Sequence, residues 1–362
     1  MNGERVPRPA APALPPEEPA AEPVLRIEDL AVHYPVRRSS GAFRAREVVR
    51  AVDGVSFDVR PGEVLALVGE SGCGKTTIAR AVMRLVEPTA GRIVFRGNDI
   101  THLRGRELRE LRQRFQMVFQ DPYESLDPRQ TVFETVSEPL LIHGRGHDAS
   151  ERRELVHRAL ERAGLHPPEE ISPRYPHHLS GGQRQRVAIA AAMVLEPTLV
   201  VADEPVSMLD VSLRAGILKL MLELRERRDL AYLFITHDLS LAWVVADRIA
   251  VIYLGRIVEI GPAADVIGRP LHPYTRALVS VVPVPEAGAA ADQILLVGEA
   301  PSPTSIPAGC RFAPRCWLRR ERGDPQECTS TDPALRGEGS AAHLTACHFA
   351  LEEGQGDPDA HR

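Results

Sequence analysis

Apolar and polar residues alternate along two stretches near the start of the chain, residues 24–34 and residues 52–59. A period of two is typical of strands that bury one face, so both stretches are predicted to be half-buried antiparallel strands. Residues 64–68 are instead apolar throughout and end at Gly69. A short, uninterrupted apolar run of this kind predicts a parallel strand that is covered on both faces.

Further apolar runs follow, and helix-compatible segments separate them. The predicted strands are residues 199–202, 231–236 and 249–254. Residues 212–227 fit a helix, and residues 150–164 carry an N-cap at Ser150, an acidic first turn and a glycine stop. Residues 121–180 as a whole have the pattern of a helical subdomain. Strands that alternate with helices predict an α/β fold around a parallel sheet.

Length and charge limit the possible functions. The 362 residues suffice for one large or two modest domains. A formal net charge of -5 gives no whole-chain attraction to nucleic acid or to an anionic membrane, so we expect no nucleic-acid partner. The longest apolar run, residues 187–195, is far shorter than the roughly 18 residues that span a bilayer. We therefore expect a soluble chain, and transport would require separate membrane subunits.

Residues 69–76 match the phosphate-binding pattern Gly-x-x-x-x-Gly-Lys-[Ser/Thr], between an apolar strand and a helix-compatible run. Backbone N–H groups and the helix N-terminus of such a P-loop surround the β- and γ-phosphates, while Lys75 adds a full charge and Thr76 can ligate Mg²⁺. Lys75 is also one of only two lysines among 44 basic residues. Cys73 is interpreted as a spacer. The predicted nucleotide contacts are Gly69, Ser71, Gly72, Cys73, Gly74, Lys75, Thr76 and Thr77.

Two carboxylates, Asp203 and Glu204, follow the apolar strand at residues 199–202. Open α/β sheets bind ligands at the carboxyl ends of their strands, so both side chains are expected beside the phosphates. Asp203 is suited to hold Mg²⁺, directly or through water, and Glu204 to polarise the water that attacks the γ-phosphate.

Residues 179–183, Leu-Ser-Gly-Gly-Gln, form the third motif. Taken alone, Ser-Gly-Gly is a flexible turn before a helix. Together with the P-loop upstream and the acidic strand end downstream, it closely resembles the motif series of an ABC transporter ATP-binding subunit. The resemblance implies a P-loop ATPase fold with an antiparallel β subdomain and a helical subdomain. Because every motif is intact, it also implies a catalytically competent ATPase that uses ATP and Mg²⁺.

The resemblance assigns four more residues. Gln120 matches the family's Q-loop, which senses Mg²⁺ and the attacking water and links to the membrane subunit. His237 matches the switch histidine that contacts the γ-phosphate, although a lone histidine is more often structural. Asp210 matches the D-loop, with Met208 where the family more often has alanine. Tyr34 is the candidate aromatic residue for stacking on adenine.

In the family, the signature segment, residues 179–183, acts on ATP held by the opposite subunit. Its chemistry is a second helix N-terminus aimed at an anion. ATP then joins two subunits, and hydrolysis loosens the dimer and drives the coupled membrane helices. The residues implied to contact the partner's nucleotide are Ser180, Gly181, Gly182 and Gln183.

Residues 120–128, the His-Pro-Tyr-Thr of residues 272–275 and the cysteine-bearing tail look like the ATP-binding subunits of dipeptide and oligopeptide importers. The resemblance covers roughly residues 24–350. It implies a paralogous ATPase partner, two membrane permease subunits and an extracytoplasmic substrate-binding protein, with this chain on the cytoplasmic face of the membrane. The polar insertion at residues 37–50 favours the second, F-type paralogue.

Other cargoes and other machines remain alternatives. A nickel chelate, glutathione or a sugar is not distinguished from a peptide, because the chain itself never touches the cargo. Chromosome-maintenance and translation ATPases carry the same motifs and act on nucleic acid or the ribosome. The first kind needs a coiled-coil arm, for which the 58 residues between Gln120 and Leu179 leave no room, and the second usually carries two motif sets.

Four cysteines lie within the last 53 residues, at Cys310, Cys316, Cys328 and Cys347. Crowded cysteines in a cytosolic chain suggest metal binding more than disulfides. Their spacing lacks the tight Cys-x₂-Cys pairs of common zinc sites, but four thiolates can hold a [4Fe-4S] cluster. The family resemblance favours the cluster, while zinc and unligated thiols stay open. Two nearby histidines are expected at the surface, His343 and His348.

These patterns divide the chain into four parts. Residues 1–23 hold seven prolines without a secretory signal pattern and are predicted to be disordered. An ABC ATPase domain is predicted for residues 24–265, a small cysteine-containing C-terminal extension for residues 266–350, and a flexible tail for residues 351–362. Beyond Val282 the sequence is treated as a region separate from the ATPase core.

Overall fold

The computed structural model describes residues 22–35, 48–121, 125–226, 229–282, 293–337 and 342–350. Three predicted features therefore lie wholly or mostly outside the described residues: the disordered N-terminal segment, the 37–50 insertion and the flexible tail. Residues 122–124 of the stretch that follows Gln120 also lie outside them.

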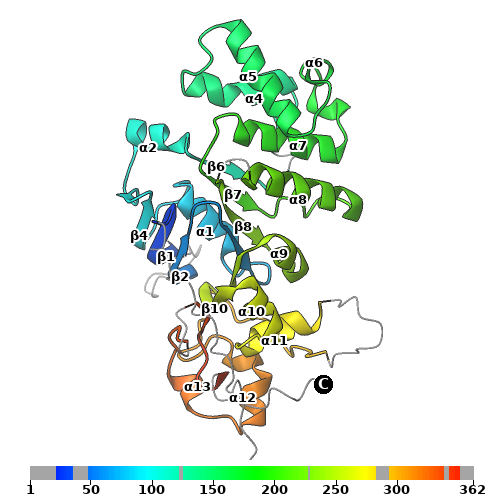
Figure 1. The fold of residues 1–362 in the computed structure, drawn as a ribbon. Helices are drawn as coiled ribbons and strands as arrows, with labels where there is room; N and C mark the ends of the chain where they lie inside the picture. The colour runs from blue at the N-terminus through cyan, green and yellow to red at the C-terminus, as the bar shows by residue number, and fades with distance from the viewer. Residues whose placement is uncertain are drawn as a thin grey trace, which may run out of the picture.

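A four-stranded antiparallel sheet confirms the first prediction from hydrophobic alternation (Figure 1). Its strands lie in the order β2-β1-β4-β5. Alternate residues of the first strand point into the core, so Leu25 and Ile27 are buried and Ile27 pairs with Phe57. The bounds are β1 (Leu25–Pro35), β2 (Val48–Val59), β4 (Ala90–Phe95) and β5 (Asn98–Asp99).

A second, seven-stranded sheet runs in the order β11-β10-β9-β3-β8-β7-β6. The strands β9, β3, β8, β7 and β6 are parallel to one another, whereas β10 is antiparallel to β9 and β11 is antiparallel to β10. This confirms the α/β fold with a parallel sheet. The bounds are β3 (Val64–Val68), β6 (Phe115–Val118), β7 (Leu199–Asp203), β8 (Ala231–Thr236), β9 (Arg248–Tyr253), β10 (Arg256–Pro262) and β11 (Leu344–Thr345).

Both faces of the parallel sheet are covered, which explains why its strands are continuously apolar. Val200 and Phe234 pack on one face with the helices α7 (Gly181–Met193) and α8 (Val211–Glu226). Leu65 and Leu233 pack on the other face with α1 (Lys75–Val82) and the antiparallel sheet. The strand β3 lies between β8 and β9 and ends at the P-loop, which places this loop at the centre of the sheet edge.

A group of helices stands at the top of Figure 1, beyond the edge strand β6. Its first long helix begins after a capping box between Thr131 and Glu134. The next helix is capped by Asp148, whose carboxylate accepts the N–H groups of Ser150 and Glu151, so the predicted cap at Ser150 was wrong by two residues. The bounds are α4 (Val132–Ile142), α5 (Ala149–Arg162), α6 (Pro168–Ile171) and the 3₁₀ helix η1 (Pro176–His178). The helix α2 (Gly105–Arg112) lies at the side, next to β6.

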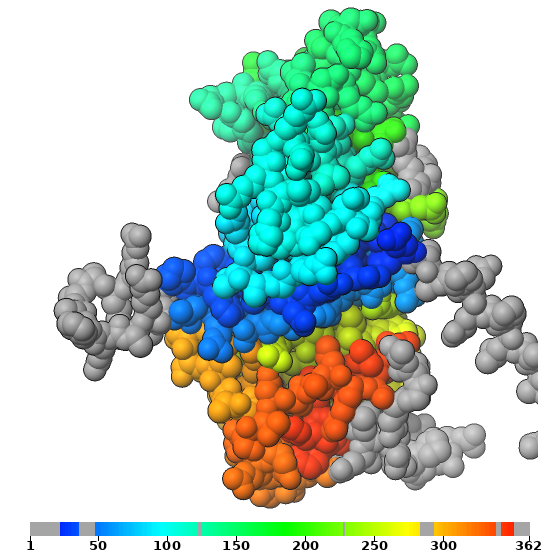
Figure 2. Space-filling view, turned by 90° about the vertical axis from the view of Figure 1, so that its left-hand side faces the viewer, coloured from blue at the N-terminus to red at the C-terminus, as the bar shows by residue number. Residues whose placement is uncertain are grey.

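The C-terminal segment, residues 293–337 and 342–350, is joined to the core rather than separate from it (Figures 1 and 2). Its strand β11 pairs with β10, opposing Thr345 to Glu259. This pairing sets His343 against buried Glu259 (Nε2–Oε1 2.8 Å) and leaves the His343 side chain only 13% exposed, so its predicted surface position was wrong. His348 is of intermediate exposure. The remaining helices are α9 (Leu239–Val245), α10 (Ala263–Gly268), α11 (Pro273–Ser280), η2 (Ala313–Arg315), α12 (Trp317–Glu321) and α13 (Glu327–Ser330).

Candidate functional site

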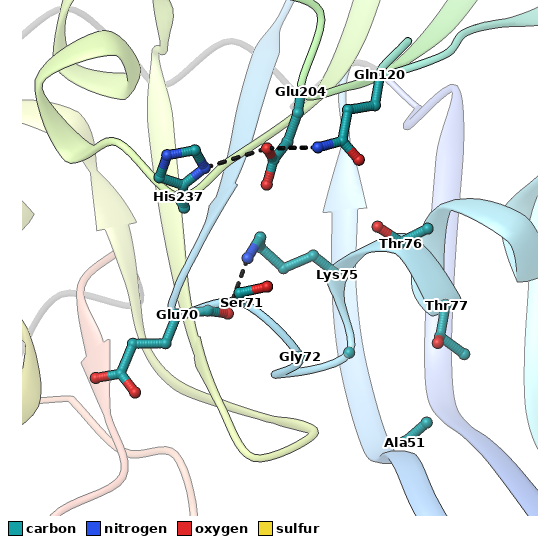
Figure 3. A pocket seen from close by; sticks show the side chains of 11 residues that line it. Ala51, Glu70, Ser71, Gly72, Lys75, Thr76, Thr77, Gln120, Glu204 and His237 are labelled. Carbon is teal, nitrogen blue, oxygen red and sulfur yellow. Dashed lines mark hydrogen bonds and ion pairs between the residues drawn. The ribbon is translucent and has the colours of Figure 1, made fainter. Parts of the chain in front are cut away.

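A pocket of about 620 Å³ opens beside the P-loop, at the carboxyl ends of the parallel strands (Figure 3). Side chains from the P-loop, from the end of β6, from the end of β7 and from the end of β8 meet there, as the sheet geometry predicts. The lining residues are Ala51, Glu70, Ser71, Gly72, Gly74, Lys75, Thr76, Thr77, Gln120, Glu204 and His237.

Two glycines of the P-loop are required by close backbone contacts. A Cβ at Gly69 would lie 2.2 Å from the carbonyl oxygen of Ile252. A Cβ at Gly74 would lie 2.2 Å from that of Ala51, and Gly74 also has a φ of +109°, which side chains rarely adopt. The loop therefore packs against β9 and β2 more tightly than any other residue type allows.

Lys75 is the first residue of α1 and is 5% exposed. Its ammonium group donates to the carbonyl oxygens of Gly69 (2.7 Å) and Glu70 (3.0 Å), which folds the side chain back over the loop. Figure 3 shows its tip facing the space below Glu204. A buried cation at a helix N-terminus, with backbone N–H groups around it, fits a polyphosphate.

Thr76 and Asp203 bring two oxygen ligands together, with the threonine hydroxyl donating to the carboxylate at 3.3 Å. Asp203 is 4% exposed, and burial raises the pKa of its carboxyl; the bond from Thr76 opposes this shift and the charge of Glu204 adds to it. A buried carboxylate with a raised pKa gains from a nearby cation. Hydroxyl and carboxylate oxygens are ligands that Mg²⁺ prefers, so this donor set fits Mg²⁺.

Glu204 is held between two polar side chains from separate strand ends (Figure 3). Its Oε2 accepts a hydrogen bond from the amide of Gln120 at 3.2 Å and lies 3.1 Å from Nδ1 of His237. Its backbone has a φ of +47°, and its N–H donates to Ile235 at 2.9 Å. Non-glycine residues in this left-handed region cluster at functional sites. The three side chains predicted for catalysis, Glu204, Gln120 and His237, are thus in direct contact with one another.

The signature residues do not line this pocket. Ser180 instead caps α7: its hydroxyl accepts from the Gln183 N–H at 3.3 Å, and the Gln183 side chain accepts from the Ser180 N–H at 3.0 Å. Gly181 and Gly182 form the first turn of this helix, and a Cβ at Gly182 would lie 3.1 Å from Leu213.

Four other predicted nucleotide contacts also lie outside the pocket lining: Tyr34, Gly69, Cys73 and Asp210. Tyr34 lies near the end of β1 and is 37% exposed. The Asp210 carboxylate accepts from the Ser212 hydroxyl and the Leu213 N–H at the start of α8. Cys73 is buried under the loop, where burial raises the pKa of its thiol.

The structure brings the four C-terminal cysteines to one small cavity of about 10 Å³. Burial raises the pKa of Cys310 to about 12 and that of Cys316 to about 11, and the neighbouring thiols add to both shifts. No disulfide joins any two of these four cysteines. Within the described ranges, no group of three or more His, Cys, Asp or Glu side chains is arranged to hold a metal ion.

Sequence reasoning missed two pocket residues. Ala51 lies on β2 and its carbonyl contacts Gly74, but no motif includes it. Glu70 occupies a variable position of the P-loop pattern, which gives no signal for its carboxylate. No helix among the described residues is long and apolar enough to cross a membrane.

Comparisons with known proteins agree with this geometry. The family model described as ABC transporter matches residues 52–207, and the one described as oligopeptide/dipeptide transporter, C-terminal region, matches residues 258–322. A putative peptide import ATP-binding protein of Brucella ovis is 47% identical over 90% of this chain and 97% of its own length. The oligopeptide transport ATP-binding protein AppF of Bacillus subtilis is 46% identical over 91% and 98%.

A solved structure is also similar: the dimeric, post-hydrolysis state of the ATP-binding cassette MJ0796 bound to ADP and Pi. The TM-score is 0.58 at 29% identity, and the match covers 66% of this chain and 98% of that one. The chain is therefore an ABC ATPase and belongs to the family of oligopeptide/dipeptide transporter ATP-binding proteins.

Proposed function

We propose that this chain hydrolyses ATP in the P-loop pocket to power an importer for dipeptides or oligopeptides, at the cytoplasmic face of the membrane. The observation that carries the proposal is the Glu204 carboxylate held by Gln120 and His237 beside the P-loop lysine. The peptide cargo is supported by the match of residues 258–322 and by the names of the relatives. A nickel chelate or glutathione is the alternative cargo.

The residues divide the work as follows. Lys75, the loop N–H groups and the N-terminus of α1 hold the phosphates, and Ser71, Gly72 and Thr77 line the same space. Glu204 accepts a hydrogen bond from the attacking water, while Gln120 and His237 fix the orientation of its carboxylate. Thr76, Asp203 and Gln120 would hold Mg²⁺, which when bound neutralises charge on the phosphate oxygens.

We further propose that the pocket is completed by a second ATPase subunit. Ser180, Gly181, Gly182 and Gln183 form a capped helix start that does not line the chain's own pocket, and Ser180 is exposed, which supports a role toward a partner's nucleotide. Tyr34 would stack on adenine and Asp210 would lie at the contact. The similar cassette MJ0796 is dimeric. The partner is proposed to be a paralogous ATPase, with this chain as the F-type member.

The trans arrangement predicts that Ser180→Ala removes most ATP turnover of the assembled transporter while ATP binding to this chain is kept. Ser150→Ala, on the first turn of α5, is the matched control and should leave turnover unchanged. ATP hydrolysis by a pure monomer of this chain at the rate of the complex would contradict the arrangement.

The membrane subunit is proposed to dock in an apolar groove of about 590 Å³ between α2, β6 and α4. Leu85, Phe119 and Ile142 line it and are 53%, 46% and 49% exposed. Exposed apolar patches of this kind mark interaction sites. Phe119 lines the groove and its sequence neighbour Gln120 lines the nucleotide pocket. An apolar helix bound in the groove would therefore contact the residue next to Gln120, so that movement of either one could displace the other.

Co-purification tests both the partner and the cargo. The chain, expressed with its permease, paralogue and binding-protein partners, should copurify with them, and its ATPase rate should rise when a di- or oligopeptide is added. Phe119→Asp should lose the permease but keep ATP binding, whereas Leu295→Asp, at an exposed apolar site outside the groove, should lose neither. Stimulation by a nickel chelate or glutathione instead of peptides would favour the alternative cargo.

We propose in addition that Cys310, Cys316, Cys328 and Cys347 bind a [4Fe-4S] cluster. Four thiols on one buried cavity supply the right donor number. The cavity is small, so the sulfur atoms would have to move outward around a cluster. Anaerobically purified protein should contain iron, acid-labile sulfide and broad visible absorbance, all lost in Cys310→Ser/Cys316→Ser. Stoichiometric zinc, or no metal, would contradict the cluster.

A further inference from the structure

The C-terminal segment reaches the far side of the P-loop through one arginine. Arg315, on η2, places its Nη1 3.1 and 3.0 Å from the two carboxylate oxygens of Glu70. Arg315 is 8% exposed, so this ion pair is largely shielded from water on the arginine side. Figure 3 shows the Glu70 carboxylate pointing away from Lys75 and Glu204, out of the catalytic end of the pocket. The contact is therefore behind the loop and leaves the nucleotide space free.

A second contact fixes the backbone of the same residue. The Glu70 N–H donates to the hydroxyl of Tyr274 at 3.0 Å, and the Glu70 carbonyl accepts from the Lys75 ammonium at 3.0 Å. Tyr274 is fully buried, with its ring 4.8 Å from that of Tyr253 and 5.4 Å from that of Phe312. Glu70 thus links a buried aromatic cluster directly to the phosphate-binding lysine.

A neighbouring arginine supports the other end of the loop. Arg311 donates to the carbonyl of Leu254 at 2.6 Å and pairs with Asp53. The next residue, Gly255, donates its N–H to the Cys73 carbonyl of the P-loop at 2.8 Å. The segment between Cys310 and Cys316 therefore supports the loop at both ends, directly at Glu70 and indirectly at Cys73.

We propose that Arg315 and Tyr274 are positioning residues of the ATPase: they hold Glu70 so that the P-loop and Lys75 keep the geometry that binds the ATP phosphates. Neither residue touches the nucleotide pocket itself. The inference rests on the proposed function, because it takes the P-loop pocket as the ATP site. It assigns to the C-terminal segment a part in ATP binding that is independent of any metal centre.

The test is a double-mutant cycle on ATP·Mg²⁺ affinity, measured with the full chain by calorimetry. Arg315→Ala and Glu70→Gln should each weaken affinity on the order of ten-fold, because either change frees the loop. The double variant should be no weaker than the worse single one, since both remove one interaction. Arg315→Lys should recover part of the loss, and Tyr274→Phe should lower affinity while it keeps the ring packing.

Arg320→Ala is the matched control, because this exposed arginine of α12 donates to Pro314 and not to the loop. Unchanged affinity in Arg315→Ala, or additive losses in the double variant, would overturn the inference. If Arg315→Ala does not fold, as judged by circular dichroism, the cycle is run with Arg315→Met, which keeps an apolar side chain but cannot pair with Glu70, and the same outcomes decide.

Lys75→Ala separates this inference from the proposed function. It should abolish ATP binding if the P-loop pocket is the ATP site. Binding that survives Lys75→Ala would refute the site itself, whereas loss in Lys75→Ala together with unchanged affinity in Arg315→Ala would refute only the positioning role.

Discussion

The two sides of the P-loop are built from different kinds of contact. On the pocket side, polar side chains from separate strand ends meet and stay accessible, and the His237 side chain is 57% exposed. On the far side, Tyr274 and Phe312 are only 0% and 1% exposed, and Arg315 forms an ion pair with Glu70. The groups that would engage nucleotide line an open pocket, while the P-loop that carries Lys75 rests on a packed support. We therefore expect substitutions on the pocket side to change ATP turnover or binding directly, and substitutions on the far side to act through the position of the P-loop.

The largest expected effect comes from filling the tightest contact of the loop. Gly74→Ala would place a Cβ 2.2 Å from the Ala51 carbonyl oxygen, so the loop must shift. A misplacement of about 1 Å at phosphate-binding groups should lower ATP affinity by about 100-fold or more, measured by calorimetry.

Gly72→Ala is the control for this variant. Gly72 also has a positive φ, at +79°, but nothing lies within 4 Å of an added Cβ. The substitution should cost only the backbone strain of about 1–2 kcal/mol, or about ten-fold in affinity. Equal losses in both variants would show that the close packing on β2 is unimportant.

Acid should weaken the buried far side first. Burial, with a further contribution from the charge of Arg276, lowers the pKa of His272 to about 3, from an ordinary value of 6.5. Between these values the unfolded chain binds a proton that the folded chain does not, so this stability is fully present above about pH 6.5 and decreases as the pH falls. Lowering the pH from about 6.5 to about 5 should remove about 2 kcal/mol from the free energy of unfolding, measured by urea titration.

His272→Asn is the comparison variant for the acid effect. Nδ1 of His272 accepts the N–H of Tyr274 at 3.1 Å, and an asparagine oxygen can take over this cap without titrating in the same range. Its stability should therefore fall less steeply between these pH values. An identical slope in both proteins would remove His272 as the cause.

A smaller effect is expected from the aromatic support. Phe312→Leu leaves an apolar side chain but loses ring contacts with Tyr253, Tyr274 and His272, so the free energy of unfolding should fall by about 1–2 kcal/mol. Phe119→Leu changes a phenylalanine that is 46% exposed, and its effect should stay within about 0.5 kcal/mol. Equal losses in the free energy of unfolding at Phe312 and Phe119 would contradict the view that the buried aromatic cluster stabilises the far side of the P-loop.

The sequence predicts the pocket side well because that side is built from local patterns. Apolar runs such as residues 64–68 must be buried strands, and parallel strands deliver the residues after them to one edge. Glu204, Gln120 and His237 therefore meet as expected.

The far side depends on pairings that no local pattern contains. Arg315 and Glu70 are 245 positions apart, and β11 joins the sheet through two residues. The exposure of His343 could not be predicted for the same reason, because it depends on a contact with buried Glu259 of β10, 84 positions away in the sequence. The cap of α5 was missed for a different reason, because Asp148 and Ser150 are both good capping residues.

The most direct test of the account is ATP turnover by Glu204→Gln in the assembled transporter, with ATP binding measured on the same preparation. Glutamine keeps the shape and the hydrogen bonding of the side chain but cannot polarise the attacking water as a carboxylate does. Turnover should fall by about 100-fold or more while ATP affinity stays within about three-fold. Glu223→Gln, on the surface of α8, should change neither quantity. A steady-state rate equal to that of the unaltered protein would contradict the assignment of Glu204 and with it the proposed site.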